Sequence, residues 1–170
     1  MLSLIHILRD KDAVQAAMMV AEAACWYASK GMTLYQAVRA MYEKYGWFKE
    51  LVVSKTLYGK EGIEKIQNAV KTLRADYPTK IGDFDVLAVR DYLKQERTDM
   101  HSGKKTPIPM ETSNVLYFEL DGARFIIRPS GTEPKLKSYL SAFSADRKEA
   151  EYLLGKLKTD AVALIEKLTD

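Results

Sequence analysis

Cysteine and histidine are scarce in this chain of 170 residues, which contains one cysteine and two histidines. The single thiol, Cys25, excludes an internal disulfide, and with only His6 and His101 as imidazoles the sequence offers no Cys/His cluster for zinc. We therefore expect a reducing, cytoplasmic setting. No apolar run approaches the roughly 20 residues that a membrane-spanning helix requires, so we expect no membrane partner.

A strong excess of charge is also lacking. The 26 basic and 23 acidic residues give a formal net charge of +3 and are well mixed. This balance gives little support to a nucleic-acid partner. The adjacent pair Lys104 and Lys105 lacks an interleaved aromatic platform, so weak nucleic-acid binding is only a third hypothesis. With 47% hydrophobic residues, the chain can bury one ordinary core or two small ones.

Helical periodicity dominates the start of the chain. Apolar side chains recur at steps of three and four from Asp12 to Ala28, which predicts a helix. Cys25 lies on its apolar face, so we expect the thiol to pack in a core. Thr33 and Gln36 have the spacing of a capping box, which predicts that a second helix begins there.

Three further segments complete the first half. The apolar residues 1–8 are expected to be a leader, either non-native or disordered. Residues 51–58 are rich in strand formers and are expected to be extended, whereas the periodicity of residues 63–73 predicts a third helix. We place a boundary near residue 80, with a mainly helical segment at 9–80 and a second domain at 81–170.

The second half has the pattern of a small antiparallel sheet covered on one face by helix. Asp121 and Gly122, set between two β-rich runs, are the typical residues of a two-residue hairpin turn. The other elements expected here are a strand at 84–93, a polar loop at 95–113, a strand at 136–143 and a final helix with Asp146 as its N-cap and Glu149 at the capping-box position. The predicted fold class is therefore α+β.

One segment has the composition of an anion-binding loop. Arg128 can direct two N–H donors at a phosphate, Ser130 and Thr132 add hydroxyl groups, and Gly131 allows the backbone to approach closely. Lys137 adds a positive charge from the following strand. The alternative is a simple turn between two strands, with Arg128 as a solvated edge charge.

The string Arg128-Pro-Ser-Gly-Thr-Glu-Pro-Lys135 resembles the C-terminal phosphate-binding domain of α-D-phosphohexomutases, the phosphoglucomutase/phosphomannomutase family. Residues 113–122, which precede this string, also resemble that domain. Residues 9–14, 42–46 and 89–93 resemble other landmarks of this family in the same order. The resemblance implies that 9–80 is the tail of the family's third domain and that 81–170 is its TATA-box-binding-protein-like C-terminal domain.

Family members transfer a phosphoryl group reversibly between the 1- and 6-positions of a hexose, using a phosphoserine and a Mg²⁺-binding aspartate loop. The sequence contains no recognisable phosphoserine motif, metal loop or sugar-recognition loop. The resemblance therefore implies a fragment, inactive alone, that binds the non-transferred phosphate of a hexose phosphate or bisphosphate through Arg128, Ser130, Gly131, Thr132 and Lys137. Its implied partners are the missing N-terminal domains. The alternative is a non-catalytic anion-binding or interaction module.

Overall fold

A computed structural model describes residues 12–131 and 133–169 of the chain. The leader predicted at residues 1–8 lies outside the described residues. The chain divides into two compact units, Met1–Tyr45 and Gly46–Asp170. Within the described residues, none of the helices combines the length and the apolar character needed to span a membrane.

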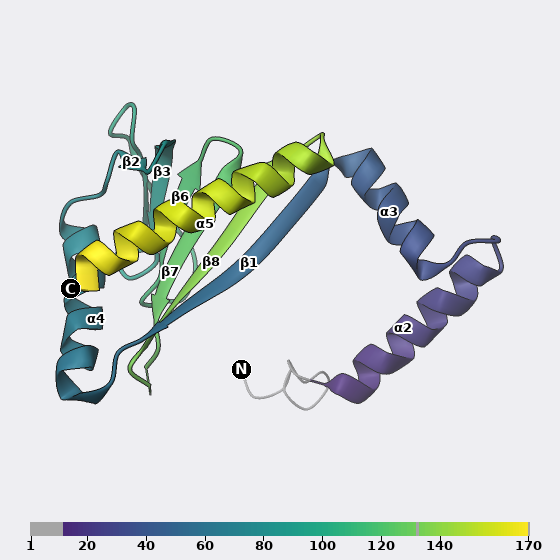
Figure 1. The fold of residues 1–170 in the computed structure, drawn as a ribbon, viewed down its shortest axis with the longest axis horizontal. Helices are drawn as coiled ribbons and strands as arrows, with labels where there is room; N and C mark the ends of the chain where they lie inside the picture. The colour runs from purple at the N-terminus through teal and green to yellow at the C-terminus, as the bar shows by residue number, and fades with distance from the viewer. Residues whose placement is uncertain (1–11, 132, 170) are drawn as a thin grey trace. The chain divides into compact units, whose positions relative to one another are not determined.

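The first unit contains helices α2 (Ala13–Ala28) and α3 (Leu34–Tyr45) (Figure 1). The side chain of Asp12 caps α2 by accepting a hydrogen bond of 2.9 Å from the backbone N–H of Gln15. The predicted capping box of α3 is confirmed: the Thr33 N–H donates to Gln36 Oε1 at 2.8 Å, and the Gln36 N–H donates to Thr33 Oγ1 at 3.2 Å. Each helix start is thus fixed by residues three positions apart.

The apolar side chains of the first unit are mostly exposed. Among the described residues of the two helices only Ala37 is buried, whereas Met18 and Trp26 are more than half exposed. The expectation that Cys25 packs in a core is wrong, because the thiol is exposed. Two short helices offer each other too little surface to bury a full apolar stripe on both.

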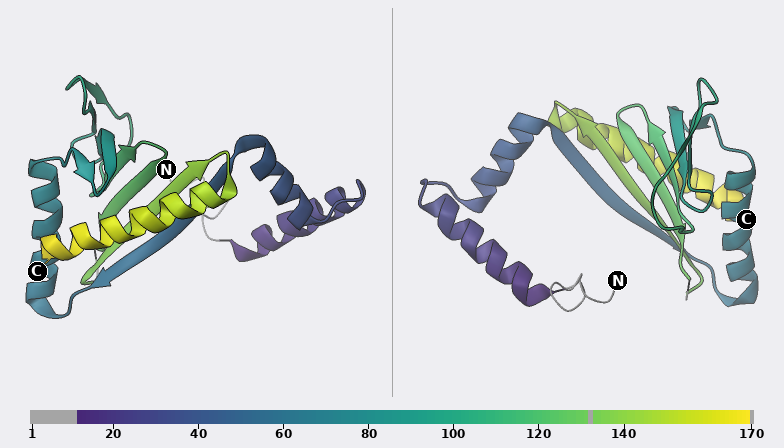
Figure 2. Two further views of the ribbon diagram at one scale, coloured as in Figure 1. Left: turned by 45° about the horizontal axis from the view of Figure 1, so that its top comes forward. Right: turned by 180° about the vertical axis from the view of Figure 1, so that it is seen from behind.

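The second unit is built on one antiparallel sheet, in the strand order β1-β8-β7-β6-β3-β4-β5, with β2 paired to β3 (Figure 2). Its strands are β1 (Trp47–Thr56), β2 (Lys80–Ile81), β3 (Phe84–Asp91), β4 (Glu96–Asp99), β5 (Lys105–Pro107), β6 (Leu116–Leu120), β7 (Ala123–Pro129) and β8 (Lys135–Ser144). Helices α4 (Gly59–Ala75) and α5 (Arg147–Thr169) complete the unit. The predicted α+β class is confirmed.

Burial alternates along the central strands, so the sheet has one covered and one open face. In β8 the even-numbered residues from Leu136 to Ser144 are buried, while the odd-numbered residues are half-buried or exposed. The covered face packs against α4 and α5 around Phe118 and Phe125, neither of which is accessible to solvent. The open face includes the odd-numbered side chains of β8 and their cross-strand neighbours on β1 and β7.

The hairpin predicted around Asp121 and Gly122 is confirmed, since β6 and β7 pair from Leu120↔Ala123 outward. Gly122 has a φ of +65°, a conformation that two-residue hairpin turns require and that glycine adopts without steric cost. The capping of α5 is confirmed at Asp146, whose side chain accepts from the Glu149 N–H at 2.9 Å. The Glu149 carboxylate does not complete the box, because it accepts from the Ser144 hydroxyl instead.

Two features differ from the sequence-based expectations. The loop expected at 95–113 contains β4 and β5, which pair with each other and extend the sheet beyond β3. The compact units divide between Tyr45 and Gly46, whereas the boundary expected near residue 80 stays a prediction about the family's domains. Residues 46–80 belong to the second unit because β1 pairs with β8 along ten residues and α4 packs into the core.

A buried ionic cluster connects α4 to β3. The Asp91 side chain is 1% exposed and accepts hydrogen bonds from Arg74 Nε, at 3.1 and 3.0 Å to its two oxygens, and from the Tyr77 hydroxyl at 3.1 Å. The backbone N–H of Leu93 donates to the same carboxylate at 3.0 Å. Arg74 also donates to Asn114 Oδ1 at 2.8 Å. A buried carboxylate is tolerated here because its oxygens are fully hydrogen-bonded.

Candidate functional site

The predicted anion-binding loop connects β7 to β8 and is closed by its own hydrogen bonds. The Ser130 N–H donates to the Lys135 carbonyl at 2.8 Å, and the Glu133 N–H donates to Ser130 Oγ at 3.3 Å. The Leu57 N–H, just after β1, donates to the Pro134 carbonyl at 3.0 Å. The loop is therefore held at one end of the sheet by its neighbouring strands.

Strand register brings two of the predicted residues together. Arg128 on β7 lies directly opposite Lys137 on β8, so both side chains project from the open face. Neither forms an ion pair or hydrogen bond with another described residue. Like charges that face each other across a sheet destabilise it. An anion bound between these two side chains would remove that repulsion.

Gly131 provides space at the loop. A Cβ atom added at Gly131 would meet no other atom within 4 Å, and its φ is not among the positive values in the chain. Backbone strain therefore does not explain a glycine at this position. Ser130 is half-buried and its hydroxyl is engaged within the loop. Thr132, also predicted to bind the anion, lies outside the described residues.

The sequence-based prediction did not include three polar side chains on the same patch of the open face. Lys135 is two residues before Lys137 and therefore projects to the same side of β8. Side chains along a strand alternate between its two faces, so the sequence was sufficient to place Lys135 on the same face as Lys137. Ser54 lies opposite Lys137, and Thr56 lies opposite Lys135, because β1 pairs with β8. These two hydroxyls come from a strand about 80 residues away, so no local pattern indicated them.

Arginine side chains continue along the open face, and two of them, Arg90 and Arg97, are paired with Glu119. Glu119 on β6 accepts from Arg97 Nε at 3.0 Å and from its second nitrogen at 2.8 Å, and also from Arg90 Nε. The hydrogen bond from Arg97 is the main reason that the pKa of Glu119 lies below its usual value, although partial burial opposes the shift. Glu119 therefore stays ionised at neutral pH, and both of its oxygens are occupied.

A metal site is not formed by the residues that the structure describes. Across 12–131 and 133–169, no three His, Cys, Asp or Glu side chains lie close enough together to hold an ion. The donor set of the loop is cationic and hydroxylic, which suits an anion and not a bare cation.

Known proteins of one family are similar to most of this chain. Residues 82–152 match the C-terminal domain of phosphoglucomutase/phosphomannomutase. A phosphoglucomutase of Staphylococcus saprophyticus is 33% identical over 135 residues, which are 79% of this chain and 24% of that protein. A phosphoglucomutase of Staphylococcus aureus is 35% identical over 134 residues, with the same shares.

This chain belongs to the phosphohexomutases and carries their C-terminal domain. It spans about a quarter of the length of the curated relatives it matches, 24% in both cases. Among solved structures, the open form of pp63/parafusin, a phosphoglucomutase from Paramecium, has a TM-score of 0.56 over 95% of this chain and 28% of its own. At 16% identity, that similarity concerns the fold.

Proposed function

We propose that this part of a phosphohexomutase binds the non-transferred phosphate of a hexose phosphate during reversible transfer between the 1- and 6-positions. The observation that supports this most directly is the pair of cations Arg128 and Lys137, which face each other across β7 and β8. Lys135 lies beside them, and none of the three has an ionic partner among the described residues. Three cations on one patch, next to a loop that leaves space at Gly131, form a site for a doubly charged anion.

Each residue has a distinct role in this proposal. The Arg128 guanidinium would donate two parallel hydrogen bonds to phosphate oxygens, and Lys137 would contribute a point charge from the neighbouring strand. The open space at Gly131 would let a phosphate oxygen approach the backbone. A mutase has to accept either end of the sugar in turn, and flexible cations around a backbone loop permit this better than a rigid stereospecific pocket. Positioning and electrostatics dominate such chemistry.

The chain alone should be inactive as a mutase, since no phosphoserine motif and no metal loop is recognisable in its sequence. The complete enzyme would be an intramolecular phosphotransferase, an isomerase, that uses Mg²⁺. In such an enzyme the ion lowers the charge repulsion at the transferring phosphoryl group. Its ligands would come from the N-terminal domains, which are the proposed protein partners. A chain with one cysteine cannot be stabilised by an internal disulfide, which suits the reducing cytoplasm.

An NMR titration of the chain with glucose 6-phosphate tests the proposal. Amide shifts should cluster at Ser130, Gly131 and the start of β8. Charge-assisted hydrogen bonds contribute about 1.5–3 kcal/mol each but compete with water at an open site. We therefore expect a net of about 4 kcal/mol, or a Kd of about 1 mM. Arg128→Ala should abolish the shifts, and Arg128→Lys should restore only part of the affinity, since an ammonium group lacks the planar fork.

A matched control separates site loss from a general loss of positive charge. Arg39 is an exposed arginine of α3 with an i,i+4 ion pair to Glu43, so Arg39→Ala removes the same charge elsewhere. This variant should bind glucose 6-phosphate like the wild type. Shifts that lie away from the loop, or that persist in Arg128→Ala, would refute the phosphate-binding role. Salt-dependent binding of long oligonucleotides that hexose phosphate does not displace would favour nucleic-acid binding instead.

A further inference from the structure

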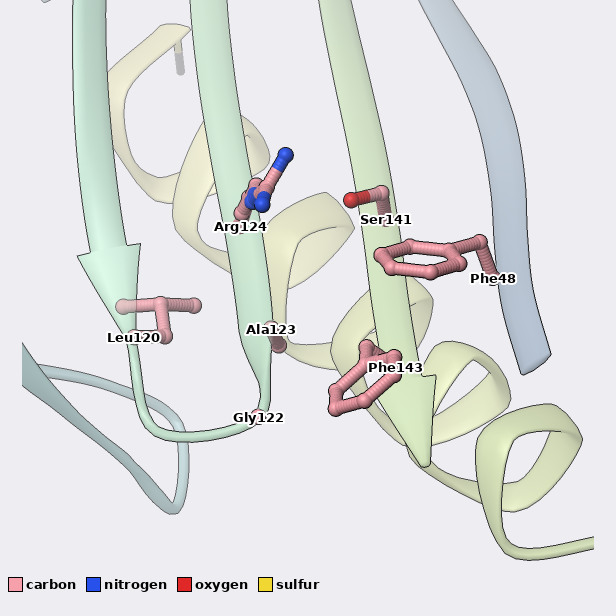
Figure 3. Close-up of a pocket in the computed structure, with 7 residues that line it drawn as sticks. All are labelled: Phe48, Leu120, Gly122, Ala123, Arg124, Ser141 and Phe143. Carbon is pink, nitrogen blue, oxygen red and sulfur yellow. The ribbon is translucent and has the colours of Figure 1, made fainter. Parts of the chain in front are cut away.

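Apart from the phosphate-binding loop, the open face of the sheet has a hollow at the end near the Asp121–Gly122 turn (Figure 3). It has a volume of about 310 Å³. The residues that line it come from β1, β6, β7, β8 and the turn: Phe48, Leu120, Gly122, Ala123, Arg124, Ser141 and Phe143. All of them lie in the second unit. The hollow therefore does not depend on where the first unit lies.

Arg124 lines this hollow as a cation that has no partner among the described residues. It lies opposite Glu119 on β6, and such a pair would ordinarily form a cross-strand ion pair. The Glu119 carboxylate is instead held by Arg97 and Arg90. Arg124 forms no hydrogen bond or ion pair with any described residue. Three arginines around one glutamate leave the patch positively charged.

Ser141 lies next to Arg124 on the neighbouring strand and adds a hydroxyl group. The two residues are directly opposite in the register of β7 and β8, and Figure 3 shows the Ser141 hydroxyl and the guanidinium on the same side of the sheet. Glu50 lies on the far side of Ser141, on β1. Two strand spacings place it about 10 Å from Arg124, and no ion pair joins the two side chains.

Two aromatic rings form the apolar wall of the hollow. Phe48 and Phe143 are 41% and 43% exposed, and their ring centroids lie 4.7 Å apart at an interplanar angle of 35°. The backbone at Gly46 packs so closely against the Phe143 ring that a Cβ atom there would overlap it. The backbone at Gly46 therefore covers one side of the Phe143 ring. Exposed ring surface beside an unpaired guanidinium favours a ligand that has both a flat ring and a negative charge.

We propose that this hollow binds a small anion carried on an aromatic ring, such as an aryl carboxylate or an aryl phosphate. Arg124 would pair with the anionic group, the Ser141 hydroxyl would donate to it, and Phe48 and Phe143 would contact the ring. The hollow is separate from the phosphate-binding loop: Arg124 is four residues before Arg128 on the same strand, which corresponds to about 13 Å.

NMR titrations with benzoate test this site, with cyclohexanecarboxylate and inorganic phosphate as comparison ligands. Benzoate should shift the amides of Gly122, Ala123, Ser141 and Phe143. Cyclohexanecarboxylate has the same charge without a flat ring and should bind at least threefold more weakly, as should phosphate at these amides. Arg124→Ala should weaken benzoate binding at least tenfold, while Arg39→Ala should leave it unchanged.

A ring variant and a site comparison complete the experiment. Phe143→Leu should weaken benzoate binding more than cyclohexanecarboxylate binding, and the dispersion of its amide spectrum verifies that it is folded. Benzoate shifts should also appear in Arg128→Ala, which separates this site from the phosphate-binding loop. Unchanged benzoate affinity in Arg124→Ala, or equal affinity for the two carboxylates, would overturn the proposal.

Discussion

Removing the buried carboxylate of Asp91 should be among the most destabilising substitutions in the second unit. Asp91→Ala leaves Arg74, whose side chain is 12% exposed, without a counter-ion in a nearly dry site. It also removes the acceptor for the Tyr77 hydroxyl and the Leu93 N–H. Breaking a buried ion pair from one side costs about 3–5 kcal/mol, and we expect a loss of that size.

The assay is urea unfolding followed by the fluorescence of Trp47, in a Trp26→Phe background so that the signal reports the second unit. Asp85→Ala is the control, since the ion pair between Asp85 and Lys80 is exposed, with 66% and 61% of the two side chains accessible. Exposed pairs contribute about 0–1 kcal/mol. Asp85→Ala should therefore shift the unfolding midpoint little.

A double variant separates the pair from the rest of the cluster. Arg74→Met combined with Asp91→Leu replaces both charges by apolar groups, which is often close to neutral for a buried pair. We expect the double variant to be more stable than Asp91→Ala alone. The reasoning fails if Asp91→Ala unfolds within 1 kcal/mol of the wild type, a value typical of an exposed pair.

Two more predictions concern single buried groups. Ser138 is inaccessible to solvent, and its hydroxyl has no hydrogen-bond partner among the described residues. Ser138→Ala should therefore raise the free energy of unfolding by about 1 kcal/mol. A urea midpoint below that of the wild type would contradict this. Burial, reinforced by Asp91, raises the pKa of Tyr77 well above its usual value. Because the folded state holds this proton more tightly, the stabilisation is complete below the unfolded pKa of about 10 and is lost as pH rises through the folded pKa. Tyr77→Phe should therefore flatten the alkaline fall in the urea midpoint; parallel curves would argue against it.

The proposed phosphate site gains its charge at a cost in stability. Arg128 and Lys137 face each other across β7 and β8, an arrangement that a sheet without a ligand would not favour. Lys135 adds a third cation on the same side. Bound phosphate should therefore stabilise the second unit, because it binds the folded arrangement and not the separated strands.

Sequence alone determined the features that depend on residues close together along the chain. The caps at Thr33 and Asp146 each use a partner three residues away, so spacing was sufficient to predict them. The hairpin at Gly122 was predicted for the same reason. The loop from Arg128 onward was recognised as a contiguous string, which placed the chain in its family before any fold was known.

Tertiary structure decided whatever depends on strand register across the sheet. The pairing of β1 with β8 joined β1 to the compact unit of the sheet and brought Ser54 opposite Lys137. The same register placed Arg124 next to a glutamate already held by two other arginines. Such neighbours come from strands far apart in sequence, and the free energy of their packing, not any local pattern, selects which residues meet.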